Sequence, residues 1–74
     1  MSDGPREIRI PGVEERPIRV LIVDDENLFA EMLASSLRNH GVDVVGVATS
    51  GKRAVAMARA ETPDIVMMDL GLPD

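Results

Sequence analysis

Three short apolar runs alternate with two helical patterns between residues 18 and 69. The runs are Ile18–Val23, Val42–Ala48 and Ile65–Met68. Because each run is almost continuously apolar, we expect strands that are covered on both faces, as in a parallel sheet.

Apolar residues between the first two runs recur at spacings of three and four, which predicts an amphipathic helix ending near Gly41. Its expected inner face consists of Leu28, Phe29, Met32, Leu33 and Leu37. We interpret His40 as a cap at the end of this helix and not as a phosphodonor. A second helix is expected to begin at a cap formed by Thr49 or Ser50. It must end before Pro63, because the residue preceding a proline disfavours helical angles. Its expected inner face is Ala54, Val55 and Ala58.

The order of elements, βαβαβ with short loops, predicts an α/β fold with right-handed crossovers. We expect a truncated doubly wound parallel sheet, the first half of such a domain. Two helices cannot cover three strands completely, so the third strand is expected to leave an apolar edge. Met67 and Met68, within that strand, are nevertheless interpreted as core residues.

Residues 1–17 contain three prolines and show no apolar periodicity, which indicates a flexible leader. Residues 18–74 then form the partial domain. The arginines at the start of the chain alternate with acids and are expected to be solvated; they are Arg6, Arg9, Arg16 and Arg19.

Composition and charge exclude several classes of function. The 74 residues carry a net charge of −5 and include no cysteine, which excludes disulfides, zinc fingers and thiol catalysis. Beyond residue 19, nine acids face four bases, and this excess argues against direct nucleic-acid binding by this segment. No apolar run approaches the ~20 residues of a membrane span, and no secretory signal is recognisable. We therefore expect a soluble, cytoplasmic protein.

Carboxylates follow two of the three predicted strands. Asp24 and Asp25 come after the first strand, and Asp69 follows the third. If these strands are neighbours they lie ~4.8 Å apart, so three like charges share one edge of the sheet. A hard cation such as Mg²⁺ relieves their repulsion, and a carboxylate beside it can attack phosphorus. Taken singly, Asp25 is equally well explained as a helix-start acid and Asp69 as a solvated turn residue.

Residues 18–74 resemble the N-terminal half of response-regulator receiver domains of two-component signalling. Two motifs carry the resemblance: Ile18–Glu26 (IRVLIVDDE) and Pro63–Asp74 (PDIVMMDLGLPD). The sequence separation between Asp25 and Asp69 also fits that family.

The resemblance implies a flavodoxin-like fold with strand order 2-1-3, and it also implies roles for the acidic residues. Asp69 is the expected phospho-acceptor, Asp25 and Asp69 are direct Mg²⁺ ligands, Asp24 acts through a water, and the backbone carbonyl of Gly71 is a further ligand. The expected phosphoryl donor is a sensor histidine kinase.

The resemblance also implies which residues contact the kinase and which parts of the family's site lie beyond residue 74. Residues expected to contact the kinase are Asn27, Leu28 and Glu31. The Ser or Thr and the Lys that complete the family's phosphoryl site fall after its fourth and fifth strands, beyond these 74 residues. A DNA-binding output module would also lie beyond residue 74.

Other functions are weighed against this one. The sequence of residues 46–53 nearly matches the phosphate-binding P-loop motif of nucleotide-hydrolysing enzymes. However, Arg53 replaces the hydroxyl residue that holds Mg²⁺ in that motif, and Gly46 falls within a predicted strand. An aspartate-based phosphatase needs a D-x-D pair, whereas Asp24 and Asp25 are adjacent. An inactive fragment that acts only as an interaction module remains an alternative.

Overall fold

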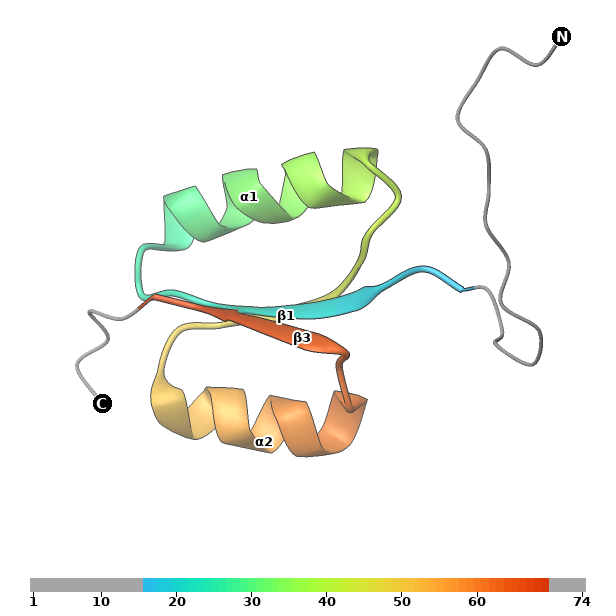
Figure 1. The fold of residues 1–74 in the computed structure, drawn as a ribbon. Helices are drawn as coiled ribbons and strands as arrows, with labels where there is room; N and C mark the ends of the chain where they lie inside the picture. The colour runs from blue at the N-terminus through green and yellow to red at the C-terminus, as the bar shows by residue number, and fades with distance from the viewer. Residues whose placement is uncertain (1–15, 70–74) are drawn as a thin grey trace, which may run out of the picture.

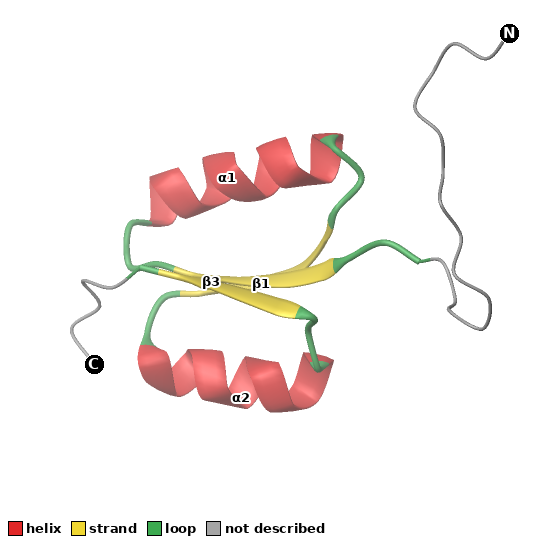
Figure 2. Ribbon diagram, in the orientation of Figure 1, coloured by secondary structure: helices red, strands yellow, loops and turns green. Residues whose placement is uncertain are grey.

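The computed structural model describes residues 16–69 as a three-stranded sheet between two helices (Figure 1). The strands are β1 (Arg19–Val23), β2 (Asp43–Ala48) and β3 (Ile65–Met68), all parallel, in the order β2-β1-β3. Helices α1 (Asn27–Asn39) and α2 (Gly51–Glu61) lie on opposite faces of the sheet (Figure 2). The predicted element order, parallel pairing and strand order are confirmed. No described helix has the length and apolarity that crossing a bilayer requires.

Local signals set the ends of the helices much as predicted. α1 ends at His40, whose ring Nδ1 lies 2.8 Å from the carbonyl oxygen of Ser36, and Gly41 then adopts a φ of +84°. That left-handed angle strains any residue with a Cβ, which explains the glycine. At α2, Ser50 is the cap, because its hydroxyl oxygen accepts the Arg53 N–H at 3.2 Å. Thr62 ends α2 in a left-handed conformation, directly before Pro63.

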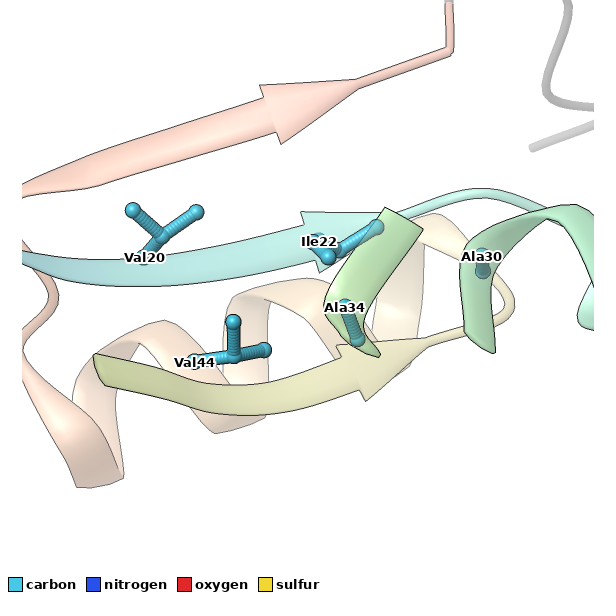
Figure 3. Close-up of a cluster of buried hydrophobic side chains, with 5 residues drawn as sticks. All are labelled: Val20, Ile22, Ala30, Ala34 and Val44. Atoms are coloured by element: carbon cyan, nitrogen blue, oxygen red, sulfur yellow. The ribbon is translucent and has the colours of Figure 1, made fainter. Parts of the chain in front are cut away.

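The core is divided between the two faces of β1. Side chains alternate along a strand, so Val20 and Ile22 face α1 while Leu21 and Val23 face α2. The first cluster is completed by Ala30, Ala34 and Val44 (Figure 3). The second is completed by Ala48 and Ala54. β1 is therefore covered on both faces, as its continuous apolar sequence predicts.

The predicted inner faces of the helices are partly wrong. In α1, Leu33 and Leu37 pack against the core, but Leu28, Phe29 and Met32 are exposed. Ala30 and Ala34 occupy the most buried positions instead, because small side chains allow the helix to approach the sheet closely. In α2, Ala54 and Ala58 face the core as expected, but Val55 is exposed and Met57 packs in its place.

β3 differs most from expectation. Its four residues are exposed, so the interpretation of Met67 and Met68 as core is wrong. The helices pack against β1 and β2, and β3 makes its tertiary contacts with β1. Within residues 16–69, the expected apolar edge is thus left uncovered, and it includes the two methionines.

Two of the arginines predicted to be solvated form ion pairs; Arg16 is exposed as predicted, whereas Arg19 is partly buried. Arg19 lies within β1, and its guanidinium donates to the carbonyl of Glu61 at 2.6 Å. Arg16 forms a two-pronged ion pair with Asp64, with both N–O distances 2.8 Å. Residues 1–15, which make up most of the predicted leader, lie outside the described part of the chain.

Candidate functional site

Three aspartates meet at the carboxyl edge of the sheet. The register aligns Val23 of β1 with Met68 of β3, so Asp24 and Asp69, the next residue on each strand, emerge side by side. One carboxylate oxygen from each of Asp24, Asp25 and Asp69 lies within 4.8 Å of the others. The structure thus brings together all three carboxylates that the sequence singles out.

Sheet hydrogen bonds fix the main chain beneath these carboxylates. The Asp69 N–H donates to the carbonyl of Val23 at 2.9 Å, and the Asp24 N–H donates to the carbonyl of Ala48 at 3.0 Å. Both aspartates therefore sit on rigid elements, which hold functional groups more tightly than loops do.

The three side chains differ in their surroundings. Asp24 is 9% exposed, and its Oδ1 accepts the Glu26 N–H at 2.9 Å, which orients the carboxylate toward the start of α1. Asp25 is exposed, and Asp69 is half-buried. The Asp24 carboxylate is thus held in place, while the exposed Asp25 carboxylate is accessible to an incoming ligand.

A shallow hollow of about 220 Å³ adjoins the carboxylates. Asp24 and Asp69 provide its polar lining, and the remaining walls are apolar. These walls are formed by Ile22, Val23, Phe29, Leu33, Met67 and Met68. Because apolar walls lower the local dielectric constant, charges at this edge interact more strongly than they would in open water. Sequence patterning did not reveal the hollow, since its residues were assigned to the core.

The donor set fits a hard cation. Mg²⁺ takes six oxygens at 2.0–2.1 Å, so oxygens on opposite sides of the ion are ~4.2 Å apart. The separations of up to 4.8 Å between these carboxylate oxygens need only a small side-chain adjustment, or a water between one carboxylate and the ion. Carboxylate oxygens are also the ligand type that Mg²⁺ prefers.

Other residues named from the sequence fall around this site. Asn27, Leu28 and Glu31 are exposed on the first turns of α1, the helix that begins beside Asp24. Gly71, whose carbonyl is the fourth expected ligand, lies outside the described residues.

The phosphate-loop alternative is not supported by the geometry. Gly46 pairs with Leu21 inside β2, where a Cβ would overlap the terminal methyl of Met57. This glycine therefore lies within a strand, with Met57 of α2 packed over it, and does not open a phosphate-binding loop.

Comparison with known proteins extends this description. Residues 20–74 match the response regulator receiver domain family. The chain is 52% identical over 61 residues to protein-glutamate methylesterase/protein-glutamine glutaminase 2 of Anaeromyxobacter dehalogenans (strain 2CP-C), covering 81% of this chain and 18% of that protein. It is 46% identical over 57 residues to transcriptional regulatory protein PdtaR of Mycobacterium tuberculosis (strain CDC 1551 / Oshkosh), covering 77% of this chain and 28% of that protein.

A solved structure gives the same result for the fold. The signal receiver domain of the response regulator NarL from Mycobacterium tuberculosis superposes with a TM-score of 0.74 at 33% identity. The match covers 80% of this chain and 48% of that one. The chain spans less than a third of the curated relatives named above. With the family match over residues 20–74, the sheet order and the relatives in agreement, the chain belongs to the response regulator receiver domain family.

Proposed function

We propose that Asp69 accepts a phosphoryl group from a phosphohistidine of a sensor histidine kinase, with Mg²⁺ bound at the same edge of the sheet. The observation that carries this proposal is the convergence of Asp24, Asp25 and Asp69 to within 4.8 Å from two adjacent strands. Membership of the receiver family supports it.

The chemistry is a nucleophilic displacement at phosphorus. An Asp69 oxygen attacks, the O–P bond forms, and the P–N bond to the imidazole breaks with its electron pair passing to the ring nitrogen. The product is an aspartyl phosphate on Asp69 and a histidine on the kinase. Most of the catalysis is positioning, since little covalent chemistry is left to other side chains.

The remaining residues hold charge and geometry. Asp25 and Asp69 would ligate Mg²⁺ directly, Asp24 through a water, and the carbonyl of Gly71 would complete the protein ligands. Bound Mg²⁺ supplies charge neutralisation at the phosphoryl oxygens. Asp24 is kept in position by the Glu26 N–H, so its carboxylate does not have to be ordered when the ion binds.

We further propose that kinase docking uses the exposed start of α1, at Asn27, Leu28 and Glu31, and that the reaction takes place in the cytoplasm. The matched relatives include a methylesterase and a transcriptional regulator, so the signal is expected to reach an output module of one of these kinds.

Labelling with acetyl phosphate tests the proposal without needing the kinase. The 74-residue chain should gain the mass of one phosphoryl group in Mg²⁺ and not in a chelator. Asp69→Asn should abolish the gain. Asp43→Asn is the matched control, because Asp43 is an exposed aspartate at the first residue of β2, at the opposite end of the strands from the acidic edge. Labelling that persists in Asp69→Asn, or that is absent from the native chain, contradicts the proposal and favours an interaction module without phosphoryl chemistry.

A further inference from the structure

At the opposite end of β3 from Asp69, Asp64 joins three parts of the chain. Its Oδ1 and Oδ2 accept from the two terminal nitrogens of Arg16, each at 2.8 Å. Its Oδ2 also accepts the backbone N–H of Arg19 at 2.8 Å, while its own N–H donates to the Arg19 carbonyl at 2.8 Å. Asp64 and Arg19 thus exchange hydrogen bonds in both directions across the β1–β3 boundary.

The side chain of Arg19 extends this network to α2. Its guanidinium donates to the Glu61 carbonyl at 2.6 Å and lies 3.4 Å from the Glu61 carboxylate. The segment that leads from α2 into β3 is therefore tied to the first residue of β1 on both sides of the turn. We call Arg16, Arg19 and Asp64 the clamp.

The apolar pattern of β3 does not define its register. All four residues are apolar, and their exposed fractions span only 38% at Met67 to 51% at Met68. Among the described residues, a one-residue slip along β1 would exchange side chains that are almost equally exposed, so burial by this part of the chain penalises the slip little. Register needs another determinant, and the clamp is the polar anchor at the start of this strand.

Register decides whether the acidic site exists. Because side chains alternate with a period of two, a one-residue slip moves each side chain of β3 to the other face of the sheet. Asp69 follows β3 directly, so its carboxylate would leave Asp24 and Asp25.

We propose that Asp64 is a positioning residue for phosphoryl acceptance: the clamp fixes β3 against β1 and thereby brings Asp69 into the acidic site. The inference rests on the proposed function of Asp69. Two arginine partners, Arg16 by its side chain and Arg19 by its N–H, hold the pKa of the Asp64 carboxyl well below its usual range. The clamp is therefore charged wherever the protein is expected to work.

Amide hydrogen exchange tests the structural half of the proposal. In Asp64→Ala, the Asp69 N–H, which donates to Val23 across β1–β3, should lose its protection. The Asp24 N–H, which donates to Ala48 across β1–β2, is the internal control and should keep it. Asp64→Asn retains one carbonyl oxygen for the Arg19 N–H and should restore part of the protection. Asp43→Asn, which removes a carboxylate that lies 3.7 Å from the Arg19 guanidinium but does not contact β3, should change neither amide.

The functional half is measured by acetyl phosphate labelling of the same variants. We expect the labelling rate to fall in Asp64→Ala, to recover partly in Asp64→Asn, and to stay native in Asp43→Asn. If both amides stay protected in Asp64→Ala, the proposal is overturned. It is also overturned if the labelling rate stays native although the Asp69 amide exchanges.

If Asp64→Ala unfolds, a second variant keeps the proposal testable. Arg16→Gln removes the two-pronged ion pair and leaves the Arg19 N–H bond, so unchanged protection of the Asp69 amide in this variant contradicts the clamp. A native chain that is not labelled defeats the proposed function, while the exchange data still test the register.

Discussion

β1 and β3 are adjacent parallel strands of similar apolar sequence in very different surroundings. Ile22 of β1 is 1% exposed, whereas its register partner Met67 in β3 is 38% exposed. β1 has a neighbouring strand on each side and a helix on each face, whereas β3 has a described neighbour only in β1. An apolar run thus specifies that a strand can be buried, and the layers around it decide whether it is.

The difference changes what holds each strand in place. Four residues of β1 are almost fully buried, so shape and apolar contact define its position. The position of β3 is defined instead by backbone hydrogen bonds and by the polar residues at its ends, Asp64 and Asp69. Because β3 has no second strand beside it among residues 16–69, its exposed apolar edge is also a site for pairing with another chain.

The largest difference between β1 and β3 is expected when a lysine replaces either of two residues that are register partners on these strands. Leu21→Lys buries an unpaired ammonium in the core and should remove the cooperative unfolding transition. Its cost approaches the whole free energy of unfolding of so small a chain, roughly 4–11 kcal/mol. Val66→Lys, at the register partner, should leave the transition in place and reduce self-association. Far-ultraviolet circular dichroism and light scattering measure these effects. A folded Leu21→Lys chain would contradict the burial of β1.

Truncation of side chains gives a smaller, graded contrast. Ile22→Ala should lower the free energy of unfolding by about 2–5 kcal/mol, because it leaves a cavity among Val20, Ala30, Ala34 and Val44. Met67→Ala, at the aligned position, should cost less than ~1 kcal/mol. The chain contains no Trp or Tyr, so urea unfolding is best followed by circular dichroism. Equal losses in the two variants would show that β3 is as well packed as β1.

The smallest effect is the pH dependence of the clamp. Arg16 and the Arg19 N–H lower the pKa of Asp64 in the folded chain, so the folded state favours the ionised carboxylate. The resulting stability is complete above the pKa of an unfolded aspartate, about 4, and is lost as pH falls from there through the lower folded value. The difference in unfolding free energy between the native chain and Asp64→Asn should therefore shrink in acid. A difference that is independent of pH would exclude the ion pair as its source.

Sequence patterning predicted what depends on local order. The βαβαβ succession, a cap of α2 at Thr49 or Ser50, the glycine after α1 and the end of α2 before Pro63 all follow from rules that act over a few residues. The inner helix faces were harder. Ala30 and Ala34 are spaced like Leu33 and Leu37, and hydrophobicity alone favoured larger side chains, of which Leu28, Phe29 and Met32 turned out to be exposed.

The acidic residues were recognised because parallel strands bring their carboxyl ends to one edge. The clamp was missed, since a pairing between Arg16 and Asp64 spans most of the domain and has no periodic signature. The hollow beside Asp69 was missed for a related reason. The hollow is lined in part by exposed residues of β3. The exposure of these residues depends on the arrangement of layers and not on the strand's own sequence.

The most direct test of the account is the effect of Mg²⁺ on stability, measured against Na⁺ at equal ionic strength. If three carboxylates share one cation site, Mg²⁺ at tenfold excess over its Kd should raise the free energy of unfolding of the native chain by roughly 1.4 kcal/mol. Asp25→Asn should lose that response and, without Mg²⁺, should be at least as stable as the native chain because a repulsion is gone. A native chain that is indifferent to Mg²⁺, or an Asp25→Asn chain that responds equally, would contradict the proposed site.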